Sequence, residues 1–201
     1  MLVEGIKSRP VYKGLSIQPH ARRHLFALEG EGANALLDQM VGLDDTILSR
    51  SEILYVARGS RGRDHDETLR GLGSDMFFTV PTIATLLFRL KGSLATANMG
   101  TRLYIAGTEG FIGQAMMVAL DYGMDHASII TEHRGSLARR VQCVHCKGIT
   151  DDVTHSPFAC SHCGLPLLVR DHYSRRLGAF QGVNIDAEEP GTAPDPEELF
   201  L

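Results

Sequence analysis

The sequence predicts a parallel α/β fold followed by a small metal-binding module, and two observations indicate this. Between residues 102 and 131, short apolar strand candidates alternate with a helical stretch, which is typical of βαβ units in a layered parallel sheet. All four cysteines of the 201-residue chain lie between residues 143 and 163, in a short polar segment. The order of these features predicts four regions. Residues 1–50 are an N-terminal mixed region packing on the core, and residues 51–135 are an α/β domain. Residues 136–187 are a Cys₄ module, and residues 188–201 are an acidic flexible tail.

The first half of the chain offers three candidate elements. Residues 21–40 are rich in Leu and Ala and are expected to be largely helical, after a turn-rich start that contains prolines. Residues 52–57, EILYVA, are a short apolar run and predict a buried strand. Residues 80–97 are apolar and carry Pro81 near their start, where proline suits the first turn of a helix.

The second half begins with the best-organised stretch of the sequence. Residues 102–106 predict a strand, residues 107–110 a tight turn, residues 111–122 a helix and residues 127–131 a second strand. Both strands are mostly apolar, as expected for a sheet that is covered on both faces. Residues 166–180 then offer strand material on both sides of a turn. The acidic, Pro-rich end is expected to be a mobile tail whose last apolar residues could dock on a partner.

The composition of the chain excludes several classes of function. The net charge of −4 gives no general attraction to nucleic acid or anionic lipid, and the absence of Trp disfavours a base-stacking surface. We find no signal-peptide pattern at the start and no apolar run of about 20 residues that could span a bilayer. The sequence therefore predicts a cytoplasmic protein that acts on neither nucleic acid nor membrane, and whose thiols stay reduced.

The cysteines form two CxxC motifs, which favour a metal site. Each motif lets two thiolates converge from one tight turn, and two such turns supply the tetrahedral sulfur set that Zn²⁺ prefers in closed structural sites. Gly164, directly after the second motif, permits the positive φ that such turns often need. We expect the ligands to be Cys143, Cys146, Cys160 and Cys163.

Other interpretations of this segment remain open. The same four thiolates could hold redox iron in a rubredoxin-like electron-transfer site, because ligand type alone does not separate iron from zinc. We favour zinc, since so short a segment has little core without a metal. His145, His155 and His162 are expected to be exposed or to support the ligands, although a Cys₃His site with one free cysteine is an alternative.

Three further patterns carry weaker signals. Gly107, Thr108 and Gly110 lie in a strand-to-helix turn where α/β folds bind ligands, but Glu109 argues against phosphate, and neither GxGxxG nor GxxxxGK[ST] occurs. The run at residues 64–67, DHDE, is a solvated loop or an acid/base or metal cluster. Three arginines are interpreted as a polar hinge between the modules or as a docking patch for an acidic partner: Arg134, Arg139 and Arg140. No catalytic residues are predicted.

The stretch LYIAGTEGFIGQAMMVALDYGMDHASIITEH resembles the last βαβ unit of the nicotinamide-binding half of ferredoxin–NADP reductases. In that family the strand leads into a Cys-Gly-Pro turn, which Ala106, Gly107 and Thr108 replace here. The family's closing Ile-x-x-Glu-x-Phe pattern survives in shifted form at residues 129–133, and the region around EILYVARGSRG lacks the GxGxxP phosphate loop. The resemblance implies a Rossmann-like sheet kept as a scaffold, with hydride chemistry lost.

Several longer segments are similar to the small accessory (gamma-type) subunits of bacterial dimethylamine monooxygenases: EILYVARG, VPTIATLLFRLKGSLATANMGTRLYIAGTEGFIGQAM, the paired CxxC segment and SRRLGAFQGVNIDAEEP. The resemblance implies two partner subunits. One carries haem and converts dimethylamine to methylamine and formaldehyde with O₂; the other is a reductase with FMN and a [2Fe–2S] cluster, supplied by NADPH.

In such a complex this chain would be a non-catalytic subunit that supports assembly and electron transfer through a zinc-ribbon-like module. A rubredoxin-like iron module and a stand-alone NAD(P)H-binding reductase fragment are the alternatives.

Overall fold

The computed structural model describes residues 8–40, 45–57 and 65–201. The chain divides into two compact units. Residues 12–135 form the first, which we call the α/β unit. Residues 8–11 and 136–201 form the second, which we call the cysteine module.

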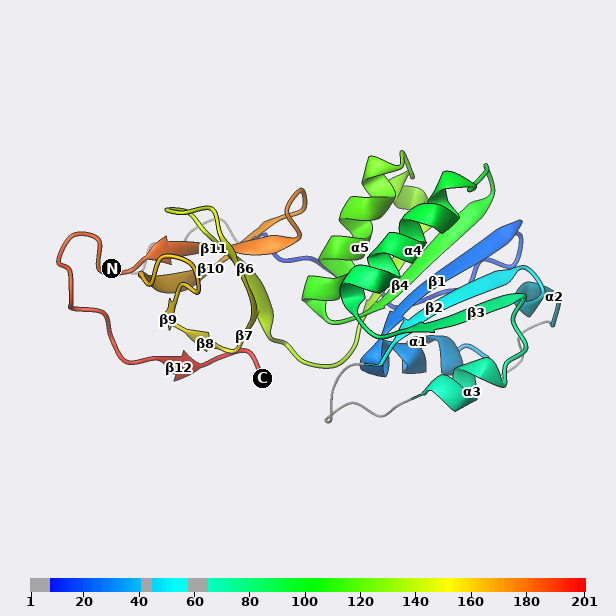
Figure 1. The fold of residues 1–201 in the computed structure, drawn as a ribbon, viewed down its shortest axis with the longest axis horizontal. Helices are drawn as coiled ribbons and strands as arrows, with labels where there is room; N and C mark the ends of the chain where they lie inside the picture. Colours follow the sequence, from blue (N-terminus) through cyan, green and yellow to red (C-terminus); the bar gives the residue numbers. More distant parts are fainter. Residues whose placement is uncertain (1–7, 41–44, 58–64) are drawn as a thin grey trace. The chain divides into compact units, whose positions relative to one another are not determined.

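The α/β unit is built on a five-stranded parallel sheet in the order β3-β2-β1-β4-β5 (Figure 1). Its strands are β1 (Arg23–Glu29), β2 (Ser51–Val56), β3 (Met76–Val80), β4 (Thr101–Gly107) and β5 (Ile129–His133). Its helices are η1 (Gly30–Gly32), α1 (Ala33–Leu37), α2 (Asp45–Leu48), α3 (Asp66–Arg70), α4 (Ile83–Ala95), α5 (Glu109–Asp121) and η2 (His126–Ser128). The predicted parallel α/β sheet is thus confirmed, and its strand order is typical of doubly wound sheets.

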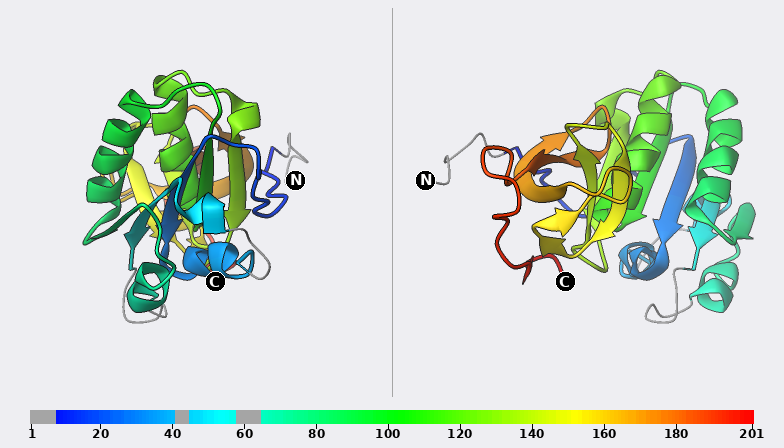
Figure 2. Two further views of the ribbon diagram at one scale, coloured as in Figure 1. Left: turned by 90° about the vertical axis from the view of Figure 1, so that its right-hand side faces the viewer. Right: turned by 60° about the vertical axis from the view of Figure 1, so that its left-hand side comes forward.

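Both faces of this sheet are covered, as the apolar strands predicted. Helices α4 and α5 pack on one face over a cluster that includes Leu86, Leu90 and Phe111, and α1 lies on the other face (Figures 1 and 2). Each long helix begins at a threonine cap: the Thr82 and Thr108 hydroxyls accept hydrogen bonds from backbone N–H groups of the first turn. The carboxyl ends of β3 and β4 therefore lead directly into the two long helices.

The prediction for residues 21–40 is wrong in its first half. Residues 23–29 form β1, the central strand, and only residues 33–37 are α-helical. The boundary expected at residue 50 therefore cuts through the sheet, because β1 pairs with β2 on one side and β4 on the other. Strand β3 was also missed. The five other elements predicted in this unit are confirmed to within a few residues: β2, α4, β4, α5 and β5.

The cysteine module contains a second five-stranded sheet, in the order β7-β6-β11-β10-β9. The module's strands are β6 (Arg139–Cys143), β7 (Ile149–Val153), β8 (His155–Ser156), β9 (Phe158–Ala159), β10 (Pro166–Ser174), β11 (Ala179–Asn184) and β12 (Glu197–Glu198). Strands β8 and β12 form a separate two-stranded sheet. Strands β10 and β11 are the pair predicted over residues 166–180. The module's buried apolar cluster is small and contains two of the cysteines, Cys143 and Cys160.

The end of the chain is not the free tail that the sequence predicted. Strand β12 pairs with β8, and Phe200 is 8% exposed within the module's apolar cluster. The Arg139 guanidinium lies between two rings, 4.1 Å from the centroid of Phe180 and 4.0 Å from that of Phe200. Cation–π contacts and burial of Phe200 therefore hold the last residues on their own module.

Within the described residues, no helix is both long enough and apolar enough to cross a membrane.

Candidate metal centre

The two CxxC motifs lie at equivalent positions in two strand pairs. The first begins at Cys143, the last residue of β6, and leads into β7, which pairs with β6. The second follows β9 and leads into β10, which pairs with β9. Each motif therefore occupies the turn of an antiparallel pair, and the sheet brings the two turns together.

The backbone of the two turns is closely similar. The N–H of Lys147 donates to the carbonyl of Cys143 at 3.0 Å, and the N–H of Gly164 donates to that of Cys160 at 2.9 Å. The residue after each second cysteine has positive φ, +64° at Lys147 and +75° at Gly164. The positive φ expected at Gly164 is therefore present, and the first turn adopts it without glycine, which is uncommon for a residue with a side chain.

The four sulfur atoms lie close enough to share one ion. They are all within 4.8 Å of one another, with Cys143 Sγ 3.9 Å from Cys163 Sγ and Cys146 Sγ 3.8 Å from Cys160 Sγ. A tetrahedral Zn²⁺ with Zn–S bonds of about 2.3 Å requires S–S separations of about 3.8 Å. The donor set and its spacing therefore fit a tetrahedral, thiolate-preferring metal.

The local electrostatics favour thiolate at one position and oppose it at another. Burial raises the pKa of Cys160, but hydrogen bonds from the backbone N–H groups of Cys163 and His162, together with those from the Cys163 and Cys146 thiols, lower this pKa to about 6. The N–H of Leu165 lowers the pKa of Cys163, but desolvation and the three neighbouring cysteines raise it to about 12. Four adjacent thiols do not all ionise together, and a divalent cation removes that obstacle.

The nearby histidines do not complete this cluster. Among the described residues, the only group of three or more His, Cys, Asp or Glu side chains with metal-ligand spacing is the set of four cysteines. His162 Nε2 lies 2.9 Å from the carbonyl oxygen of Ile149, and its ring covers Gly148, where an added Cβ would come within 2.4 Å. His162 therefore packs one turn against the other, as a supporting group would.

The other predicted turn lies at the carboxyl edge of the parallel sheet, between β1 and β4, where doubly wound sheets bind ligands. The Glu29 carboxylate occupies this place: it is 2% exposed and accepts hydrogen bonds from the Thr108 N–H at 2.9 Å and hydroxyl at 2.6 Å. A Cβ on Gly107 would come within 2.7 Å of Glu29 Cβ. The chain's own carboxylate thus takes the anion position, which makes the turn a poor phosphate site.

Sequence reasoning missed a glycine-rich loop. A glycine-rich loop was expected only after residues 52–57, which form β2. Residues 30–35, GEGANA, follow β1 and match the alanine-ending form of the dinucleotide-binding fingerprint. The second glycine, Gly32, allows close packing, since an added Cβ would lie 2.1 Å from the Ala106 carbonyl oxygen. The signal was readable once β1 was recognised as a strand.

The remaining candidates do not converge. His65 is 4% exposed, and its backbone N–H donates to the Tyr55 hydroxyl. The Asp66 carboxylate accepts hydrogen bonds from the Thr79 hydroxyl and the Arg70 guanidinium, and Asp64 lies outside the described residues. The solvated-loop interpretation is therefore wrong for His65.

The three arginines also act separately. Arg134 pairs with Glu132 and Asp38 inside the α/β unit. In the cysteine module Arg139 pairs with Asp171, and Arg140 with Asp151. Each guanidinium is thus engaged within its own unit.

Models of known protein families match both units of the chain. The model of the dimethylamine monooxygenase subunit DmmA-like N-terminal domain matches residues 4–129, and the model of the corresponding C-terminal domain matches residues 140–183. The chain belongs to the DmmA-like family. This confirms the resemblance to dimethylamine monooxygenase subunits that the sequence shows. The DmmA-like chain is also 31% identical over 156 residues to the heme-dependent oxidative N-demethylase delta subunit of Ectopseudomonas mendocina (strain ymp), covering 75% of this chain and 89% of that protein.

Solved structures give weaker similarities to the DmmA-like chain. The flavohem-like FAD/NAD-binding domain of nitric oxide dioxygenase from Vibrio cholerae O1 biovar El Tor is 17% identical, with a TM-score of 0.45, over 63% of this chain and 56% of that one. The flavohemoglobin of Malassezia yamatoensis is 14% identical, with a TM-score of 0.42, over 60% of this chain and 33% of that one. The chain thus spans only part of each, and similarity at this level supports no inference about function.

Proposed function

We propose that this chain is a non-catalytic, zinc-binding subunit of a multi-component, NADPH- and O₂-dependent dimethylamine monooxygenase. A haem subunit would convert dimethylamine to methylamine and formaldehyde, and a reductase subunit with FMN and a [2Fe–2S] cluster would supply electrons. The observation that carries the proposal is the match of DmmA-like models to both parts of the chain, together with its relative among oxidative N-demethylase subunits.

The proposed zinc has a structural role. Cys143, Cys146, Cys160 and Cys163 would hold it, and four protein thiolates leave no open position for water or substrate, as in closed structural sites. The two turns would then be fastened together, forming a zinc-ribbon-like module. Because the module's apolar cluster is small, we propose that metal binding supplies much of its folding free energy.

The α/β unit is proposed to be a Rossmann-like scaffold that no longer carries a nucleotide. Its strand order and the loop at residues 30–35 support a reductase-like ancestry. Glu29 on the Thr108 N–H opposes a pyrophosphate there, which argues against a stand-alone NAD(P)H-dependent reductase. The chain would then support assembly and bring the reductase and haem subunits into electron-transfer contact.

The second candidate is an electron-transfer module with redox iron on the same cysteines. The observation that favours it is the Cys₄ donor set itself, which accepts iron as readily as zinc. The identity of the bound metal separates the two candidates.

Reconstitution tests the proposed function. Purified haem and reductase subunits are assayed for formaldehyde production from dimethylamine and NADPH, with and without this chain. We expect omission to lower turnover about tenfold or more and addition of the wild-type chain to restore it. Full turnover without the chain would exclude a required role in the complex.

A further inference from the structure

A groove of about 880 Å³ runs along α4 on the α/β unit, between that helix, the edge strand β3 and the end of α5. Three large apolar side chains that line it are exposed: Phe88 by 77%, Tyr122 by 46% and Met76 by 38%. Exposed apolar groups gathered in one concave site mark interaction surfaces more often than chance placement. This groove is therefore a candidate docking surface.

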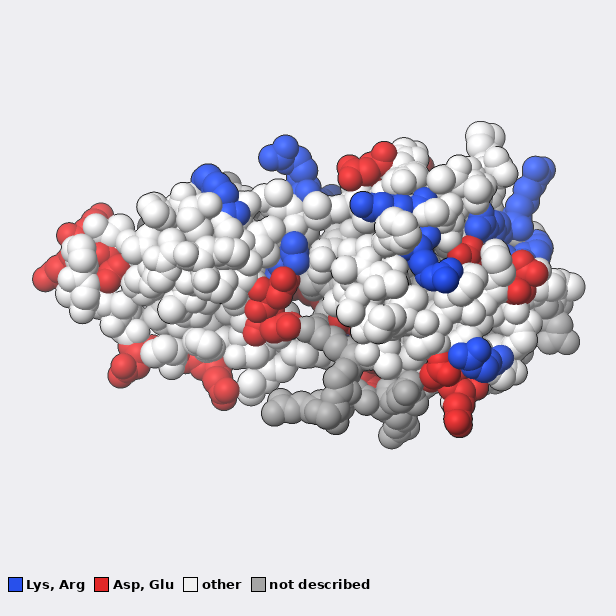
Figure 3. All heavy atoms as spheres, in the orientation of Figure 1, with Lys and Arg blue, Asp and Glu red and all other residues white. Residues whose placement is uncertain are grey.

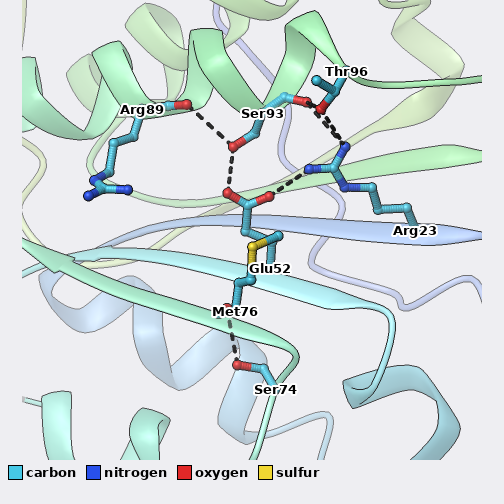
Figure 4. A network of polar contacts seen from close by, with 7 residues as sticks. All are labelled: Arg23, Glu52, Ser74, Met76, Arg89, Ser93 and Thr96. Atoms are coloured by element: carbon cyan, nitrogen blue, oxygen red, sulfur yellow. Dashed lines mark hydrogen bonds and ion pairs between the residues drawn. The ribbon is translucent and has the colours of Figure 1, made fainter.

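The floor of the groove carries no uncompensated negative charge (Figure 4). Glu52, which is 5% exposed, accepts hydrogen bonds from Arg23 Nη2 at 2.7 Å and from the Ser93 hydroxyl at 2.5 Å. Arg23 also donates to the Ser93 carbonyl and the Thr96 hydroxyl, so the network ties β1 and β2 to α4. Among the described residues that line the groove, Glu52 is the only one with a carboxylate, and its charge is balanced by Arg23.

The rim is basic. The Arg89 guanidinium lies 4.0 Å from the Phe78 ring centroid, and Lys91 is exposed on the next part of α4. Lys and Arg side chains are visible over the face that α4 presents (Figure 3). Gly92 leaves space between Phe88 and Ala95, because an added Cβ there would meet nothing within 4 Å. The groove is apolar within and positively charged at its edge.

We propose that this groove docks a partner subunit of the oxygenase complex through an acidic segment with an apolar anchor. The anchor side chain enters above Gly92 against Phe88 and Met76, and flanking carboxylates meet Arg89 and Lys91. Charge complementarity selects the acidic partner, and the buried apolar contact provides the affinity. The proposal rests on the proposed function, because it assumes that the chain works within a complex.

Three variants test the groove. Gly92→Gln fills the open space with a good helix former, so it blocks docking without weakening α4. Lys91→Glu reverses a rim charge. Met99→Gln is the matched control, because Met99 is 93% exposed and does not line the groove. Each fluorescently labelled full-length chain is titrated with the purified haem subunit and, separately, the purified reductase subunit at two salt concentrations.

We expect wild type and Met99→Gln to bind one of these subunits equally, and Gly92→Gln to bind it about tenfold or more weakly. Lys91→Glu should bind more weakly at low salt and lose most of the salt dependence. If wild type binds a partner and Gly92→Gln binds equally well, the groove is not the docking site. If wild type binds neither subunit, the proposed function fails instead. Self-association of wild type that Gly92→Gln abolishes, with partner binding intact, would identify a second copy as the occupant and overturn the proposal.

Discussion

Replacing Cys143 with Ser is expected to unfold the cysteine module while the α/β unit stays folded. Cys143 is 1% exposed, ends β6 and belongs to the module's small apolar cluster. Structural zinc contributes on the order of 10 kcal/mol to the folding of small metal-dependent modules, and the loss of one thiolate removes much of this. Amide hydrogen exchange should show loss of protection over residues 139–184 and normal protection in the central strands β1, β2 and β4 of the α/β unit. The purified variant should also lose its metal.

His145→Ala is the matched control for this variant. His145 is exposed within the first turn, and we expect its replacement to leave metal content and hydrogen exchange unchanged. Loss of metal in His145→Ala would support a Cys₃His site. Normal metal content and protection in Cys143→Ser would contradict the role assigned to the four sulfurs.

Replacing Gly32 with Ala is expected to destabilise the α/β unit by about 3 kcal/mol. The added Cβ would lie 2.1 Å from the Ala106 oxygen and 2.8 Å from the Gly107 nitrogen, and these are backbone atoms of the central strand β4 that cannot turn aside. The midpoint of urea unfolding, followed by a signal from this unit, measures the change.

Gly92→Ala provides the comparison, because this glycine lies inside α4 with open space around it. We expect Gly92→Ala to raise stability by about 1 kcal/mol, since alanine favours the helix. Equal stability of Gly32→Ala and wild type would mean that the loop after β1 does not pack closely against β4.

The paired cysteines could be predicted because their chemistry is local. Two CxxC turns need only a few consecutive residues each, and the positive φ at Gly164 was expected from the glycine that follows the second motif. The βαβ unit at residues 101–133 was predictable for the same reason, since strand, cap and helix follow each other directly.

Strand β1 could not be recognised from its own residues. Residues 24–29 are buried on both faces, so their apolar pattern lacks the alternation that separates a strand from a helix, and Leu and Ala favour a helix by propensity. Pairing with β2 and β4 decides the outcome. Missing β1 also concealed the loop at residues 30–35 and the contact of Glu29 with Thr108.

The chain end shows the same limit at longer range. Phe200 is fixed by the Arg139 guanidinium, about sixty residues earlier, and nothing within the acidic stretch itself indicates that contact. The exposure of Phe88 beside Gly92 likewise depends on which face of α4 packs on the sheet.

Metal analysis of the aerobically purified full-length chain tests the proposal that the four cysteines hold a structural zinc. Elemental analysis and the visible absorption spectrum are measured on the same sample. We expect one zinc per chain and a colourless protein. A red protein with one iron per chain would contradict the claim and identify the cysteine module as an electron-transfer centre.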